Sequence, residues 1–121
     1  MTVTTQTSFD FDAYRQAVEE NDLSAQSAFF GDDTEYTLID AQNPPGTPLV
    51  RRGRKEIAST LAEKSPEGLT HRIEDHVLDD RRAAYIERCS YPNGQQVVCH
   101  VLLDLRGGGI ARARCVQAYD A

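Results

Sequence analysis

Hydrophobic and polar positions follow two different patterns along this chain. Near the N-terminus, apolar residues recur at helical spacing, whereas from residue 69 onward aromatic and β-branched stretches read as strands separated by turns. The order, helices first and an antiparallel meander last, predicts an α+β domain. Helices are predicted over residues 11–20, 23–30 and 54–64. Strands are predicted over residues 34–40, 49–52, 69–78, 83–91, 95–106 and 110–119.

Short polar segments mark where these elements begin and end. Asp10 or Asp12 can cap the first helix, and Gly31 is expected to end the second. Residues 41–48 hold three of the five prolines and a glycine, which excludes a helix or a central strand there. This segment is predicted to be a long loop, and such loops often border functional sites.

Turn signals separate the four strands of the meander. They lie at Asp79-Asp80, at Asn93-Gly94 and at residues 107–109. Asn-Gly is the strongest short-range hairpin signal, because both residue types tolerate the positive φ of a primed turn. Strand 95–106 has one apolar face and one mixed face, so one is expected to meet the helices and the other a partner subunit. The apolar face consists of Val97, Cys99, Val101, Leu103 and Leu105.

Length and composition narrow the class of protein. The 121 residues suffice for one domain, predicted over 9–121, behind a disordered tail of residues 1–8. No apolar run approaches the roughly 20 residues of a membrane-spanning helix, and no signal peptide is visible. The protein is therefore expected in the cytoplasm, without a membrane partner.

Charge and cysteine spacing exclude further classes. The net charge of −6 at pH 7 opposes binding to a phosphate backbone, so no nucleic acid is expected as a partner. Cys89, Cys99 and Cys115 lack the close spacing of zinc or redox motifs and are expected to pack as small hydrophobes. Phosphate-loop and dinucleotide fingerprints are also absent. Neither a metal nor an organic cofactor is predicted.

Several short motifs, in this order of elements, carry a family likeness. They are Phe29-Phe30-Gly31-Asp32-Asp33, Arg51-Arg52-Gly53, Lys55-Glu56-Ile57, Gly109-Ile110 and Tyr119-Asp120. From Phe9 onward the chain resembles the nuclear-transport-factor-2-like superfamily, and within it the SnoaL-like polyketide cyclases and ketosteroid isomerases. The resemblance implies a cone-shaped α+β half-barrel, with three N-terminal helices packed on a strongly curved, mostly antiparallel sheet. It also implies an apolar pocket for a small organic ligand and a homodimer formed through the outer sheet face.

Candidate catalytic residues follow from the same resemblance. Ketosteroid isomerases combine a carboxylate base with a tyrosine and a neutral aspartic acid that bind the developing oxyanion. Tyr14 matches the tyrosine, eight residues before Asp22; the alternative is a core aromatic without a catalytic role. Leu38 takes the position of the base. Asp40, two residues further on the same strand face, is then either a substitute base or a solvated loop carboxylate.

The second acid of the family falls on strand 95–106. Counting back from the Gly109-Ile110 turn places it at His100, whereas counting from the Asn93-Gly94 turn places it at Leu103. A pocket-facing His100 has a pKa suited to acid–base chemistry near neutral pH, and an outward-facing one is an interface residue. The predicted catalytic residues are Tyr14, Asp40 and His100.

Pocket residues can be carried over in the same way. Arg88 replaces an apolar pocket position of ketosteroid isomerase: facing inward, it implies an anionic or carbonyl-bearing ligand, and otherwise Glu87 or Asp104 can pair with it. His71 and His76 are expected on opposite faces of their strand unless a bulge intervenes, because their separation is odd. The predicted pocket residues are Phe30, Tyr36, Leu38, Leu61, Ile86, Arg88 and Leu102.

Two functions are compatible with these features. The first is a cofactor-independent isomerase, cyclase or lyase that transfers a proton next to a carbonyl group of a small apolar ligand; Tyr14 and His100 favour it. The second is a non-catalytic ligand-binding or dimerisation module of the same fold, and the absence of a carboxylate at Leu38 favours that alternative.

Overall fold

The computed structural model of the protein describes residues 8–120. The predicted tail, residues 1–8, lies outside the described residues except for Ser8. The described chain forms three helices and six strands. The helices are α1 (Phe11–Glu19), α2 (Leu23–Ser27) and α3 (Arg54–Lys64). The strands are β1 (Phe30–Ile39), β2 (Leu49–Arg52), β3 (Thr70–Leu78), β4 (Arg82–Ser90), β5 (Gln96–Arg106) and β6 (Gly109–Tyr119).

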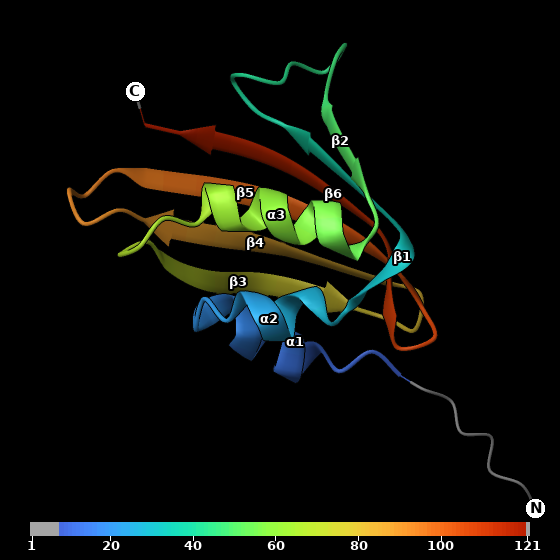
Figure 1. Ribbon diagram of the computed structural model, residues 1–121. Coiled ribbons are helices and arrows are strands. Elements are labelled where there is room, and N and C mark those ends of the chain that lie inside the picture. The colour runs from blue at the N-terminus through green and yellow to red at the C-terminus, as the bar shows by residue number, and fades with distance from the viewer. Residues whose placement is uncertain (1–7, 121) are drawn as a thin grey trace, which may run out of the picture.

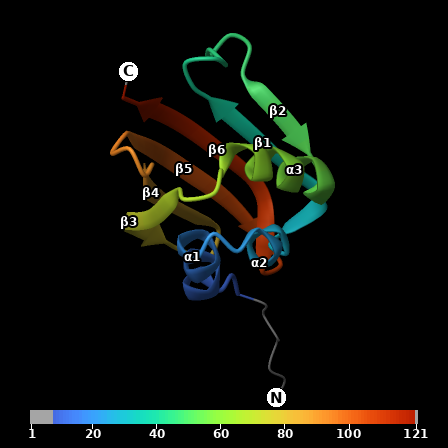
Figure 2. The same cartoon turned by 60° about the vertical axis from the view of Figure 1, so that its left-hand side comes forward.

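All six strands belong to one curved, unclosed sheet with the order β2-β1-β6-β5-β4-β3. The pairs from β3 to β6 are consecutive and antiparallel, which confirms the predicted meander, whereas β1 pairs parallel with β6. The sheet curves behind α3, α1 packs on β3, and α2 lies between the other two helices (Figure 1). Figure 2 shows the same cone turned by 60°. The predicted fold class is confirmed.

Aspartate side chains begin the first two helices. The Asp10 carboxylate accepts a hydrogen bond from the backbone N of Ala13 at 3.0 Å, so Asp10 rather than Asp12 caps α1. Asp22 caps α2 in the same way, through the backbone N of Ala25 at 3.1 Å. Both helices start where a side chain can satisfy a free backbone N–H.

The second helix is shorter than the sequence pattern predicts. It ends at Ser27, because Phe30 already pairs with Ile110 at the start of β1. Gly31 therefore lies inside a strand, and the prediction that it ends a helix is wrong. Its backbone N–H instead donates to the Thr34 hydroxyl at 2.8 Å, which supports the irregular start of β1.

The primed turn forms at the glycine-rich site, not at Asn93-Gly94. Gly107 and Gly108 both have positive φ, 59° and 82°, and they connect β5 to β6 as a two-residue loop. At the other turn only Gly94 has a positive φ, 92°, and its N–H donates to the Tyr91 carbonyl at 2.9 Å. The Asn-Gly pair thus predicts a hairpin correctly but not the type of its turn.

Besides the irregular start of β1, two further register shifts alter which residues share a strand face. Between β3 and β4 the pairing shifts after Glu74, and Asp75 takes a positive φ of 49°. Between β5 and β6 the pairing shifts at Asp104, where the partner positions move from Arg112 to Ile110. The extra residue lies on β3 in the first case and on β6 in the second, so the alternation of inward and outward side chains is interrupted on these two strands but not on β4 or β5.

The core lies between the helices and the concave face of the sheet. Leu38, Ile57 and Leu103 are fully buried and come from β1, α3 and β5. The apolar face of β5 is the one that meets the helices. Within residues 8–120, no helix has the length and apolar character needed to cross a membrane.

Candidate functional site

A cavity of about 400 Å³ lies between the helices and the concave sheet face. All three helices contribute to its lining, together with β1 and the strands from β3 to β6. Its lining includes six aromatic residues and three cysteines, and several polar lining residues lie at or next to the ends of β1, β6 and α3 or the start of β5. These polar residues are Asp40, Gln42, Glu63, Lys64, Gln95 and Gln117.

One predicted catalytic residue and two predicted pocket residues lie together on the side of the sheet that faces away from this cavity. Ile86, His100 and Leu102 line a shallow groove on the outer face of the sheet. They alternate along β4 and β5 with residues that line the cavity, so their side chains point to the other side. This corrects the expectations that His100 is catalytic and that Ile86 and Leu102 contact the ligand.

The two turn-based counts place the family's second acid on opposite faces of β5, because His100 and Leu103 are an odd number of residues apart. β5 pairs with β4 without interruption from Gln96 to Asp104, so its alternation is regular and the count from Asn93-Gly94 gives Leu103. Leu103 is buried and lines the cavity. The second count therefore selects the correct face.

Arg88 also lies on the outer face. Its Nε is 3.5 Å from the Glu74 carboxylate, and its side chain is exposed. The expectation of an inward Arg88 is corrected. The plain ion pair is what forms, although with Glu74 rather than with Glu87 or Asp104.

Asp40 lines the cavity but is occupied by its own loop. One carboxylate oxygen accepts hydrogen bonds from the backbone N of Gln42 and of Asn43 and from the Asn43 side chain, at 2.8 to 2.9 Å. The other oxygen lies 3.9 Å from Lys64 Nζ. The side chain is only 3% exposed, so Asp40 is neither solvated nor free. It anchors the proline loop at the cavity mouth.

The remaining predicted residues lie on the helix side of the sheet. Phe30, Tyr36 and Leu61 line the cavity. Leu38 shares the strand face of Tyr36 but is packed in the core, outside the cavity lining. The position of the family's base thus carries a buried leucine.

Tyr14 contacts a second tyrosine inside the cavity. Its hydroxyl lies 2.6 Å from that of Tyr85, and both residues line the cavity. Burial raises the pKa of both hydroxyls well above the ordinary value, and the charge of Glu87 raises each further. Both tyrosines are therefore neutral hydrogen-bond donors at physiological pH.

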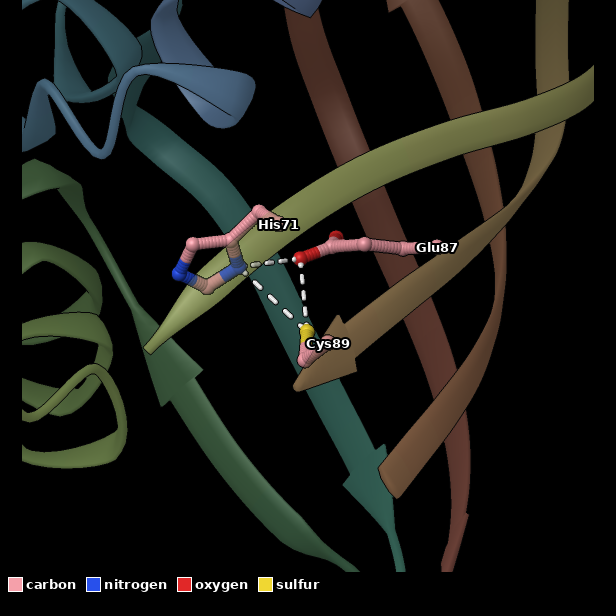
Figure 3. Close-up of side chains that lie close together, drawn as sticks. All are labelled: His71, Glu87 and Cys89. Atoms are coloured by element: carbon pink, nitrogen blue, oxygen red, sulfur yellow. Dashed lines mark hydrogen bonds and ion pairs between the residues drawn. The ribbon is translucent and has the colours of Figure 1, made fainter. Parts of the chain in front are cut away.

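A second polar cluster, His71, Glu87 and Cys89, lies on the cavity wall (Figure 3). His71 Nδ1 is 2.8 Å from a Glu87 carboxylate oxygen and 3.3 Å from Cys89 Sγ. The Cys89 thiol donates to the same carboxylate oxygen at 3.4 Å. Strand pairing explains the arrangement: His71 lies opposite Cys89, and Glu87 precedes Cys89 by two residues on the same face.

The ionisation of His71 follows from its neighbours. Burial lowers the pKa of His71, but its hydrogen bonds to Cys89 and Glu87 outweigh burial and raise the pKa to about 9. The imidazolium form therefore prevails at neutral pH. His71 Nε2 is buried and has no hydrogen-bond partner among residues 8–120. Figure 3 shows it on the side of the ring turned away from Glu87 and Cys89.

The bulge that separates His71 from His76 brings both residues to the helix side. The His76 ring stacks on Phe11 of α1, with centroids 4.5 Å apart and an interplanar angle of 17°. The expectation of opposite faces is corrected, because the shift at Asp75 reverses the alternation. His76 is exposed and is not part of the cavity lining.

His71, Tyr85, Glu87 and Cys89 are functional candidates that the sequence interpretation missed. The signal was present on β4, where Ala83, Tyr85 and Cys89 form an apolar face interrupted by one carboxylate, Glu87. A lone acid on an otherwise buried strand face needs a partner. The residues predicted for the pocket on this strand, Ile86 and Arg88, belong to its opposite face.

Comparison with known proteins agrees with this architecture. The sequence profile of the SnoaL-like domain family matches residues 11–113. This chain belongs to the SnoaL-like family. The search of curated proteins finds no relative of it.

Solved structures similar to this SnoaL-like chain share its fold at low identity. An NTF2-like protein of unknown function from Mesorhizobium loti is 16% identical with a TM-score of 0.75, over 89% of this chain and 87% of that one. A candidate ketosteroid isomerase from Kribbella flavida is 18% identical with a TM-score of 0.72, over 92% and 78%. The Δ5-3-ketosteroid isomerase from Mycobacterium sp. is 18% identical with a TM-score of 0.65, over 91% and 95%. At such identities the likeness establishes the fold alone.

Proposed function

We propose that this SnoaL-like protein binds a small, largely apolar carbonyl compound in its cavity and transfers a proton next to the carbonyl group. The cavity volume of about 400 Å³ falls in the range of small-molecule sites, and its lining combines apolar walls with few polar groups. Two structural neighbours are described as ketosteroid isomerases, which supports this reaction class. No organic cofactor is required for it.

One observation carries the proposal: His71 is held by a carboxylate at one nitrogen and has no hydrogen-bond partner at the other within the described part of the chain. Glu87 accepts the Nδ1–H, which fixes the orientation of the ring. Nε2 is then the atom that gives a proton to the ligand and takes one back, so no proton is consumed overall. In this proposal His71 assumes the role that the sequence assigned to His100.

The tyrosine pair supplies the complementary interaction. In a pair of hydroxyls, one donates to the other, and the accepting hydroxyl keeps its own proton for a ligand. A carbonyl oxygen placed beside Tyr14 and Tyr85 receives a neutral, buried donor. One such donor stabilises a developing oxyanion by about 3 kcal/mol.

The test compares two histidines on opposite sheet faces. His71→Gln and His100→Gln are assayed with a Δ5-3-ketosteroid and smaller cyclic β,γ-unsaturated ketones, following the absorbance of the conjugated enone. We expect His71→Gln to lower kcat/KM by about a hundredfold or more, and His100→Gln to leave it unchanged. Equal activity of both variants, with folding checked by circular dichroism, would contradict the proposal.

Ligand binding without catalysis is the second candidate function. Leu38 at the family's base position, and the three hydrogen bonds that hold one oxygen of Asp40 in its own loop, favour it. The expected result is that ketones shift the NMR signals of cavity residues but are not converted by the wild-type protein. That result would support binding without catalysis.

We also propose a homodimer through the outer sheet face. The groove on that face is lined by Val77 and Val116, which are 70% and 52% exposed. Apolar side chains this exposed are typical of surfaces that meet a partner. The family resemblance points to a second copy of the chain.

A further inference from the structure

Three potential metal ligands of different chemistry meet on the cavity wall. His71 Nδ1, a Glu87 carboxylate oxygen and Cys89 Sγ all lie within 4.8 Å of one another (Figure 3). We propose that these three side chains bind a zinc-class divalent cation. The sequence gives no sign of this site, because its ligands come from two strands and match no linear metal motif.

The spacing of the three atoms suits a tetrahedral ion. Zinc bonds of about 2.0 to 2.3 Å place neighbouring ligand atoms about 3.3 to 3.6 Å apart. The observed separations are 2.8 Å between Nδ1 and oxygen, 3.3 Å between Nδ1 and sulfur, and 3.4 Å between sulfur and oxygen. Side-chain rotations that move Nδ1 and the carboxylate oxygen apart by about 0.5 Å therefore open the triangle enough to receive the ion.

The identity of the donors selects the class of ion. An imidazole nitrogen, a carboxylate and a thiolate form a mixed set that suits zinc, whereas magnesium and calcium prefer oxygen alone. A thiolate and a carboxylate together balance the charge of a divalent cation. That balance matters here, because the Cys89, His71 and Glu87 side chains are no more than 14% exposed.

The strands hold the site in advance of binding. His71 and Cys89 are direct partners in the β3–β4 ladder, and Glu87 is one pleat away on β4. All three line the cavity, so a fourth coordination position is available to a water or to a ligand oxygen. Three protein ligands with one open position are typical of catalytic rather than structural zinc sites.

This inference does not depend on the proposed function, although it uses the same side chains. In the metal-free protein, His71 Nδ1 is hydrogen-bonded to Glu87. In the metal-loaded protein, His71 Nδ1 and the Glu87 carboxylate both coordinate the ion instead. The released Nδ1–H and thiol protons pass to solvent. The same protein molecule therefore cannot hold the His71–Glu87 hydrogen bond and the metal ion at the same time.

Cobalt(II) titration of the reduced, chelator-treated full chain tests the proposal. We expect binding of one ion per chain, with intense visible bands of a tetrahedral ion and a near-ultraviolet sulfur-to-cobalt charge-transfer band. Added zinc should bleach both signals by displacement. Absence of the charge-transfer band in the wild-type protein would overturn the proposal.

Matched variants locate the site. Cys89→Ser should abolish the charge-transfer band, and His71→Gln and Glu87→Gln should weaken cobalt binding about tenfold or more. Cys115→Ser and His76→Gln are the controls and should bind as the wild-type does, since neither residue is in the triangle. A band that persists in Cys89→Ser, or that Cys115→Ser removes, contradicts the assignment. The proposed proton transfer is assayed without metal, so either proposal can fail alone.

Discussion

Each face of the sheet carries a carboxylate with several partners, but the surroundings of the two carboxylates differ. On the concave face, Glu87 is 14% exposed and meets one imidazole and one thiol. On the outer face, Asp104 is 22% exposed and meets three arginines, Arg82, Arg112 and Arg114. The outer cluster is a surface ion network, whereas the inner one is a sparse polar group inside an apolar cavity.

The difference shows which polar residues are candidates for function. Ion pairs at a surface contribute little to the free energy of folding, because water screens their charges. A carboxylate enclosed by aromatic and thiol side chains costs free energy, which its few partners must offset. Among residues 8–120, each cluster holds one buried nitrogen without a hydrogen-bond partner, His71 Nε2 inside and Arg114 Nε outside. The enclosure of Glu87 in the cavity is therefore what makes the inner cluster better explained by ligand chemistry than by stability.

Adjacent leucines on β5 provide the largest expected contrast in stability. Leu103 is fully buried on the concave face, whereas Leu102 is half-buried in the outer groove. Leu103→Ala should lower the free energy of unfolding by about 2 to 5 kcal/mol, through lost burial and a new cavity. Leu102→Ala should cost clearly less. Urea denaturation of both variants measures the contrast, and equal losses would refute the assignment of faces.

Removing the Tyr14 hydroxyl should have the next largest effect, a fall in the rate of the proposed reaction. Tyr14→Phe keeps the ring in the core but removes the partner of Tyr85. We expect kcat for the best ketone to fall by about a hundredfold, with little change in KM. Tyr119→Phe is the control, since Tyr119 lines the same cavity but is 40% exposed. A similar loss in both variants would mean that the tyrosine pair has no specific role.

The contrast between the two sheet faces also explains which parts of the fold and of the candidate site could be predicted from the sequence. The elements and the meander were predictable, because alternation and glycine-rich turns act locally, and Phe30, Tyr36 and Leu61 lie in the cavity as expected. His100 was misplaced because counts from the two flanking turns differ by an odd number of residues, and the turns themselves do not indicate which face of β5 carries the family's second acid. The pairing of His71 with Glu87 was missed because it depends on which residues of two strands face each other.

The oligomeric state gives a smaller, concentration-dependent effect. Val116→Glu places a charge in the outer groove and should shift the proposed dimer toward monomer in sedimentation experiments. Val50→Glu is the matched control, because Val50 is similarly exposed, at 46%, but lies on β2 outside the groove. A wild-type protein that sediments as a monomer would contradict the proposed interface.

The smallest expected effect concerns Asp104. Burial raises the pKa of Asp104, but the hydrogen bond from Arg112 and the charges of the three arginines lower it overall. A carboxyl whose folded pKa is depressed adds stability above its unfolded pKa and loses it as the pH falls through the folded value.

Asp104→Asn should therefore lower the free energy of unfolding at neutral pH by no more than about 1 kcal/mol, because the cluster is open to solvent. The gap between variant and wild type should shrink as the pH is lowered from neutral to below the ordinary aspartate pKa of about 3.9, toward the lowered pKa of Asp104 in the folded protein. High salt should shrink it as well. Urea denaturation at both pH values is the measurement. A loss comparable to that of Leu103→Ala would show that the outer network is as important to the fold as the core.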